Sequence, residues 1–163
     1  MSSTPAVTLD SVTDWLAQAV GEVCETMFSQ VAIPVAPGAA PEGGEMAGTL
    51  VTSIGFGGAC DVDVAIHLPL VLATKLASRV LEMPEAELDD AMVNDVGGEF
   101  GNMVVGAVKS RVTDLGIDCQ MTLPKVVRGK QNDGAGQVRG ERKRLGFQVG
   151  SEVLWMDVGF GRA

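Results

Sequence analysis

The chain of 163 residues contains one histidine, three cysteines and no tyrosine. The histidine, His67, has no acid among its immediate neighbours and lies just before Pro69. A Ser-His-Asp or Cys-His hydrolase would have to use this one imidazole, which argues against both classes of enzyme. We therefore expect His67 to have a structural or a surface role.

The three cysteines, Cys24, Cys60 and Cys119, lie far apart and lack the paired spacing of a metal site. An odd number of cysteines, with no marker of secretion, indicates free thiols in a reducing compartment. Because a free cysteine usually behaves as a small apolar residue, we expect these three to fill core positions.

Positive charge is also scarce, since 12 lysines and arginines face 21 aspartates and glutamates, for a net charge of -9. An acidic surface repels a phosphate backbone, so we expect no binding to nucleic acid. The single basic cluster, residues 139–144, suits the exposed start of a strand. No window reaches the roughly 18 apolar residues of a membrane span, and the first residues lack the pattern of a signal peptide. We expect a cytoplasmic protein with no membrane partner.

The spacing of apolar residues predicts the secondary structure. Apolar residues recur every three or four positions over 9–31, as in an amphipathic helix, and further helices are predicted over 69–81 and 85–115. Near-alternating β-branched segments predict strands over residues 48–56, 60–68, 117–123, 125–130, 143–150 and 152–160. We predict one α+β domain over 1–163, with two long helices packed on one face of a mostly antiparallel, roughly six-stranded sheet. A loose N-terminus is expected over about residues 1–8, and a Pro/Gly loop over about residues 34–45.

Several residues predict where these elements begin, end or turn. Asp10 or Ser11 is expected to cap the N-terminus of the first helix. Gly116 is expected just beyond the C-terminus of the last helix. A Gly-Gly pair at 57–58 and a Gly-Ser pair at 150–151 predict tight turns, each joining two strands as a hairpin.

Polar residues of the last predicted helix fall on one line. At roughly 100° per residue, Asp95 and Asn102 lie about 40° and about 60° from Glu99 on the same side, and Gly106, four positions beyond Asn102, joins this line. Gly97 lies on the opposite, apolar side of the helix. The pattern alone favours a structural explanation, in which polar residues face water and small residues allow close packing.

The glycines of this helix have two expected tasks. Gly97 and Gly101, on the apolar side, would let the helix sit close to the sheet or to the other long helix. Gly106, on the polar line, would leave room beside Asn102. Each glycine costs roughly 1 kcal/mol of helix propensity relative to alanine, so packing or docking is expected to compensate.

The residues around this line resemble a family signature. Asp95-x3-Glu99-x2-Asn102, followed 22 positions later by Pro124, is similar to the signature of the CheC/CheX/FliY chemotaxis phosphatases. The nine letters from Asn102, NMVVGAVKS, and the segment LPKVVRGK around Pro124 resemble the family's helix and following strands. The order of elements is also similar over residues 9–158.

The resemblance implies hydrolysis of the aspartyl phosphate on a response regulator of the CheY type. It implies that Asn102 positions the attacking water and that Glu99 pairs with a lysine of the regulator. Asp95 would support docking or local geometry, Pro124 would shape the turn after the helix, and Gly106 would let the partner's loops approach. No cofactor belongs to this chain, because the regulator carries the Mg²⁺.

The first long helix lacks a second copy of the motif. Its letters AVGEVCETMFSQ contain Glu22 and Glu25 without an asparagine three positions on, so we expect both glutamates to face solvent. One motif in a chain of this length resembles CheX rather than CheC, and that resemblance implies a homodimer joined through sheet edges. The alternative is a non-catalytic CheX-like binding or dimerisation module, and a flagellar-switch component similar to FliY ranks below both.

We predict no metal site in the chain itself. Asp89, Asp90 and Asp95 are close in sequence, but Asp89 and Asp90 point away from the Glu99 line. A solvated helix start that gains from the helix dipole explains these acids.

Overall fold

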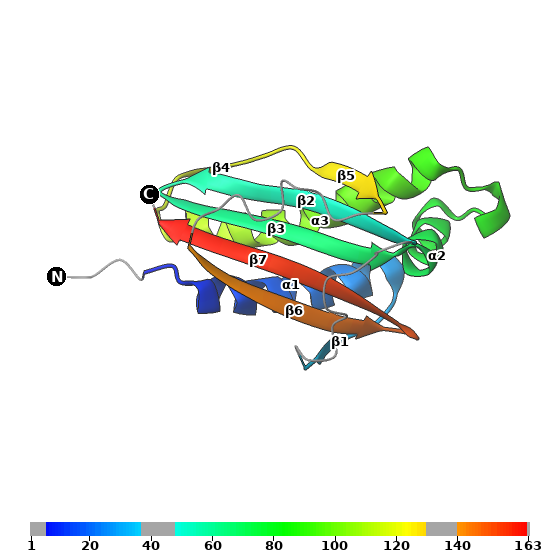
Figure 1. The fold of residues 1–163 in the computed structure, drawn as a ribbon, viewed down its shortest axis with the longest axis horizontal. Coiled ribbons are helices and arrows are strands. Elements are labelled where there is room, and N and C mark those ends of the chain that lie inside the picture. Colours follow the sequence, from blue (N-terminus) through cyan, green and yellow to red (C-terminus); the bar gives the residue numbers. More distant parts are fainter. Residues whose placement is uncertain (1–5, 37–47, 130–139, 163) are drawn as a thin grey trace.

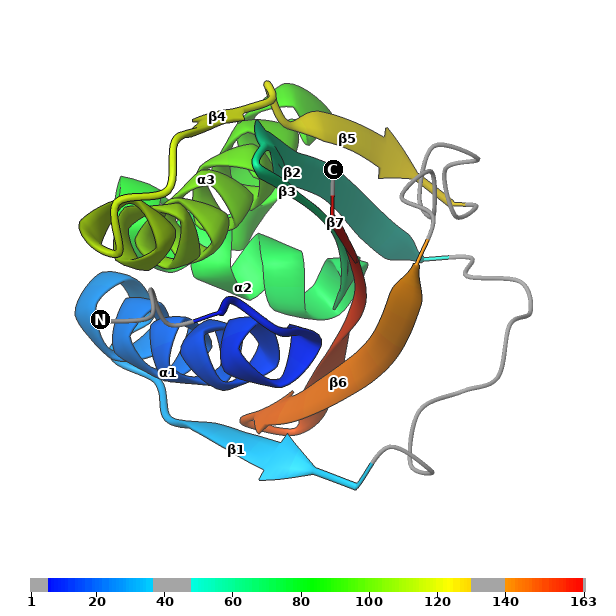
Figure 2. The ribbon, with the colours of Figure 1, turned by 90° about the vertical axis from the view of Figure 1, so that its left-hand side faces the viewer.

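A computed structural model of the protein describes residues 6–36, 48–129 and 140–162. It forms an antiparallel sheet of seven strands with its helices on one face (Figures 1 and 2). The helices are α1 (Leu9–Phe28), α2 (Leu70–Leu81) and α3 (Asp90–Asp114), with a 3-10 turn over Glu85–Glu87. The strands are β1 (Ala32–Val35), β2 (Thr49–Gly58), β3 (Cys60–Pro69), β4 (Cys119–Met121), β5 (Lys125–Arg128), β6 (Glu141–Val149) and β7 (Glu152–Arg162). The predicted fold class, two long helices on one face of a mostly antiparallel sheet, is confirmed, with α2 as a third, shorter helix.

The strand order is β1-β6-β7-β3-β2-β4, and β5 pairs with β2 along the same edge as β4. The pairs of described strands are antiparallel. Both predicted hairpins are present, because β2 pairs with β3 and β6 pairs with β7. Gly57 and Gly58, predicted to form the first turn, lie at the end of β2, and the connection to β3 is made at Ala59. The C-terminal strand β7 therefore lies in the interior of the sheet, between β6 and β3 (Figure 1).

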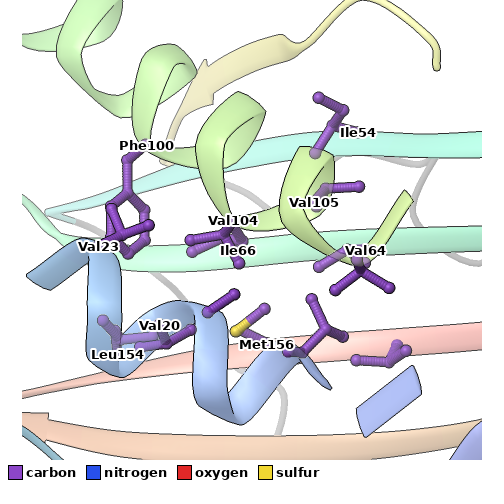
Figure 3. Packing of buried hydrophobic residues seen from close by; sticks show 14 of the residues in the cluster. Val20, Val23, Ile54, Val64, Ile66, Phe100, Val104, Val105, Leu154 and Met156 are labelled. Carbon is purple, nitrogen blue, oxygen red and sulfur yellow. The ribbon is translucent and has the colours of Figure 1, made fainter. Parts of the chain in front are cut away.

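The core lies between the sheet and the helices. Figure 3 shows side chains of α1, α3 and three strands converging there, namely Val20, Val23, Phe100, Val104, Val105, Ile54, Val64, Ile66, Leu154 and Met156. The alternation along β3 explains how the sheet takes part, since Val62, Val64, Ile66 and Leu68 all point to this side and are buried. Such burial is the main force that holds an amphipathic helix on a sheet.

The start of α1 differs from the prediction. Thr8, and neither Asp10 nor Ser11, is the N-cap, and the Ser11 amide donates to the Thr8 Oγ1 at 3.1 Å. In return the Thr8 amide donates to the Ser11 hydroxyl at 2.8 Å, which completes a capping box. Val7 is buried, so ordered packing begins before residue 8.

The end of α1 was predicted three residues too late, because Ser29 takes a left-handed φ of 52° and stops the helix. The chain then forms β1, which the sequence did not predict and which brings the sheet to seven strands. Pro34 lies inside β1, where the Pro/Gly loop was expected to begin, and aligns with Phe147 of β6. A proline is tolerated there because β1 is an edge strand.

The last helix begins at Asp90 rather than at Glu85. Asp89 is its N-cap and accepts a hydrogen bond from the Met92 amide at 2.8 Å. Gly116 follows the helix with a φ of 83°, as predicted for a glycine beyond a C-terminus. No helix in the described ranges is both long and apolar enough to span a membrane.

Candidate active site on α3

The predicted polar line lies on the outward side of α3. Asp95 and Glu99 are exposed, and Asn102 and Gly106 are half-buried. Asn102 follows Glu99 by one turn of an unbroken helix, so the carboxylate and the carboxamide are neighbours on its surface. The two side chains are thus available to another molecule rather than packed into the core.

Packing on the inner side of α3 sets this orientation. Phe100, the residue after Glu99, is fully buried, and its ring lies 5.8 Å from that of Phe28 on α1. Val104 and Val108 continue the same buried side of the helix. Rotating α3 to bury Glu99 would expose these three side chains, and each would cost about 1.5–3 kcal/mol of lost burial.

Gly97 and Gly101 let α3 approach β2, as their place on the apolar side of the helix predicted. A Cβ at Gly101 would lie 2.7 Å from the Thr52 Cγ2, and one at Gly97 would collide with the Leu50 side chain. The Thr52 hydroxyl also donates to the Gly97 carbonyl at 3.2 Å in the buried interface. Of the two predicted neighbours, the sheet or the other long helix, the close contact is with the sheet.

Two residues of the β4–β5 segment border the site. Pro124 is half-buried beside α3, since a Cβ at Gly98 would lie 3.9 Å from its Cγ. A Cβ at Gly106 would meet the Met121 sulfur at 3.7 Å, which is an ordinary contact. Internal packing therefore requires glycine at Gly97 and Gly101 but not at Gly106.

An ion-pair cluster ties the first turn of α3 to β5. The Arg128 guanidinium donates to the Asn94 side-chain oxygen at 2.9 Å and lies 3.0 Å from a carboxylate oxygen of Asp90. This link uses Asp90, which the sequence assigned only to the solvated helix start. Asp95 and Glu99 take no part in this link to Arg128.

Within the described residues, Asp95, Glu99 and Asn102 form no side-chain hydrogen bond or ion pair. An exposed carboxylate can accept an ammonium or guanidinium group. A carboxamide offers both a donor and an acceptor, and so can hold a water in a fixed direction. The arrangement suits a partner that brings its own reactive group.

A shallow groove of about 350 Å³ opens beside the site. Its lining comes from all three helices and comprises Met27, Val80, Leu81, Met92, Asp95, Val96 and Glu99. A larger cavity of about 540 Å³ lies between α2 and the turn that joins β6 to β7, and none of the predicted site residues lines it. We place the candidate site at the smaller groove, because Asp95 and Glu99 belong to both the groove and the polar line.

A second polar cluster lies on the sheet, away from α3. His67 is buried, and its Nε2 lies 3.1 Å from Asp157, which also accepts from the Arg144 Nε at 2.6 Å. Burial alone would raise the pKa of Asp157, but hydrogen bonds and positive charge from His67 and Arg144 outweigh it and lower the pKa to about 2. Of the two roles expected for His67, the structure assigns the structural one. The acid was missed because residues 67 and 157 are far apart in sequence.

The other predicted polar and thiol residues have ordinary surroundings. Glu22 and Glu25 are exposed on α1, as expected. All three cysteines are buried, and burial raises the pKa of Cys24 to about 11. In the part of the chain that the structure describes, no three His, Cys, Asp or Glu side chains gather as metal ligands.

These features define an α+β domain that presents an acid and an amide on the outward side of one of the helices that cover the sheet. The family model described as chemotaxis phosphatase CheX matches residues 50–145, which is more than half of the chain and includes α3. The chain therefore belongs to the CheX family of chemotaxis phosphatases, as the motif predicted.

Solved structures share the fold across almost the whole chain. CheX from Vibrio vulnificus is 23% identical with a TM-score of 0.77, covering 99% of this chain and 100% of that one. A CheC-like superfamily protein from Shewanella sp. PV-4 is 22% identical with a TM-score of 0.78, covering 95% and 99%. CheX from Borrelia burgdorferi, in a complex with CheY, BeF3 and Mg²⁺, is 15% identical with a TM-score of 0.70, covering 91% and 97%. No curated protein sequence matches the chain significantly.

Proposed function

We propose that this protein accelerates hydrolysis of the aspartyl phosphate on a response regulator of the CheY type. The observation that carries the proposal is the outward line of Glu99 and Asn102 on α3, which has no partner within the described residues. Membership of a chemotaxis phosphatase family and the fold shared with a CheX solved together with CheY support it.

The proposed chemistry is one of positioning. An acyl phosphate is already activated, and the regulator supplies its own Mg²⁺ and lysine, so the phosphatase needs no nucleophile. Asn102 holds a water in line with the phosphorus–oxygen bond that breaks, which lowers the entropic cost of attack. The water oxygen bonds to phosphorus, the aspartate oxygen leaves as carboxylate, and the products are phosphate and unmodified regulator.

Glu99 is proposed to bind the regulator's lysine, and this ion pair would align α3 with the phosphorylated pocket of the regulator. Its exposed position suits a carboxylate that must reach a cation on another molecule. Asp95, one turn earlier on the same line, is proposed to support docking. Gly106 is proposed to leave space for the partner's loops, which would explain a glycine that internal packing does not require.

The test is a phosphate-release assay on phosphorylated receiver domains from the same organism. Asn102→Ala is expected to lower the turnover of the bound regulator roughly 100-fold, as for the loss of one positioned polar group. Glu99→Ala is expected to reduce hydrolysis at least as much. Glu25→Ala on α1 is the matched control, because it removes an exposed helix carboxylate that neither belongs to the polar line nor lines the groove.

Two results would count against the enzyme. A wild-type protein that shortens the lifetime of no phosphorylated receiver domain would favour the non-catalytic binding module. Full activity in Asn102→Ala, with Glu25→Ala behaving as wild type, would remove the amide from the mechanism. Unchanged thermal unfolding of each variant is needed to assign the loss to chemistry rather than to misfolding.

We also propose that the protein forms a homodimer through a sheet edge. The edge strands of the described sheet are β1 on one side and β4 with β5 on the other, and β1 is short. Pairing with a second copy would cover main-chain groups that an edge leaves open. Light scattering of the purified protein tests this, and a monomer at micromolar concentration would contradict it.

A further inference from the structure

We propose that the groove beside Glu99 is a second contact for the regulator, and that it receives an apolar side chain next to the lysine that Glu99 binds. In this inference Leu81 and Met92 set affinity and specificity, while Asn102 performs the chemistry. The inference rests on the proposed function and names the part of the partner that this surface fits.

The groove is apolar at its floor and walls. Met27 comes from the end of α1, Val80 and Leu81 from the end of α2, and Met92 and Val96 from the first turns of α3. Leu81 is 39% exposed, although most large apolar side chains of the described chain are buried. Methionine side chains are flexible and polarizable, so two of them in one small groove can adapt to an incoming side chain.

The charges that line the groove are both negative. Asp95 and Glu99 belong to the lining, and no described lysine or arginine does. An occupant must therefore bring an apolar group for the walls and a cation for the acids. A purely apolar occupant would cover two carboxylates without pairing them, which is costly.

The groove also continues the proposed catalytic line. Glu99 lines the groove and lies one helical turn before Asn102. A receiver domain that places its lysine on Glu99 must therefore cover the groove as well. Because Glu99 belongs to both surfaces, the regulator rather than an unrelated ligand is the expected occupant of the groove.

The test substitutes exposed Leu81 and half-buried Met92 without adding charge. Leu81→Gln and Met92→Gln keep a similar helix propensity but remove the apolar contact. The matched control is Val71→Gln at the opposite end of α2, because Val71 is also exposed, at 56%, and does not line the groove. Met92→Leu is the conservative variant and should keep wild-type behaviour.

Two quantities separate docking from chemistry. The first is the dissociation constant for a receiver domain loaded with beryllofluoride as a phosphoryl mimic, and the second is the split between KM and kcat for hydrolysis. Each glutamine variant is expected to raise both the dissociation constant and KM about 10-fold, the usual effect of losing an interface anchor. The kcat at saturation should stay within about twofold of wild type, in contrast to Asn102→Ala.

Several outcomes would overturn the inference. Wild-type dissociation constants and KM in both glutamine variants would remove the groove from docking and leave the proposed hydrolysis standing. A fall in kcat with KM unchanged would also contradict it. If wild type binds the receiver domain but does not hydrolyse its phosphate, the proposed function fails. The dissociation constants of the glutamine variants then still test whether the groove contacts the regulator. A homodimer that dissociates in the glutamine variants would make the groove an interface between copies instead.

Discussion

Gly101→Ala and Gly106→Ala should change the free energy of unfolding in opposite directions, although both positions lie in the middle of α3, away from its ends. At Gly101 the new Cβ would lie 2.7 Å from the Thr52 Cγ2. Thr52 is fully buried and its hydroxyl is bonded to the Gly97 carbonyl, so it cannot easily turn away. Overpacking of this kind destabilises the folded state by about 1–3 kcal/mol, and the better helix propensity of alanine offsets about 1 kcal/mol of that loss.

At Gly106 no such cost arises, because the new Cβ would make an ordinary contact of 3.7 Å with the Met121 sulfur. Gly106→Ala should therefore gain roughly 0.5–1 kcal/mol from lower chain entropy in the unfolded state. Gly101→Ala should lose about 1 kcal/mol net. At about 2–4 °C per kcal/mol for a chain of this size, the two melting temperatures should differ by roughly 5 °C.

Urea unfolding followed by circular dichroism measures both free energies of unfolding against wild type. Stabilisation by Gly101→Ala would refute the close approach of α3 to β2. Destabilisation by Gly106→Ala would refute the conclusion that internal packing leaves this glycine free. A Gly106→Ala protein that is more stable yet slower in hydrolysis would support the proposed approach of the partner's loops at this position.

Two further predictions concern the sheet and the thiols. The folded-state pKa of Asp157, about 2, lies below its ordinary value of 3.8, so its stabilising effect of about 2 kcal/mol is present above pH 4 and is lost as pH falls toward 2. Asp157→Asn should therefore be less stable than wild type at pH 7 and should show a smaller loss on acidification in urea titrations; equal acid sensitivity of the two proteins would contradict this. Because Cys24 is buried and its pKa is raised to about 11, a colorimetric thiol reagent at pH 8 should modify it only in denaturant; rapid reaction of the native protein would contradict this.

The elements that the sequence predicts well are those in which apolar residues recur at a regular spacing within one segment. The buried stripe of α1 and the alternation of β3 each lie within one continuous segment, so residue spacing alone reveals them. The line of Glu99 and Asn102 is likewise local to one helix. Its outward orientation follows from the apolar residues opposite it, of which Phe100 is the clearest.

The features that sequence did not predict depend on pairing between distant segments. β1 is four residues long and contains Pro34, and it is a strand because β6 lies beside it. The contact of His67 with Asp157 arises from the register of β3 against β7, which a single sequence does not reveal. The groove at Leu81 needs the ends of three helices to meet, and no spacing within one segment predicts that meeting.

The position of β7 has a consequence for synthesis on the ribosome. β7 follows the other described strands in the sequence but lies between β3 and β6, so the two parts of the sheet cannot join until β7 has emerged. Until then the outer edge of β3, with its apolar residues, stays open to other nascent chains. A stop codon ahead of Glu152 would leave that edge permanently uncovered, and we expect such a truncated product to aggregate rather than retain partial activity.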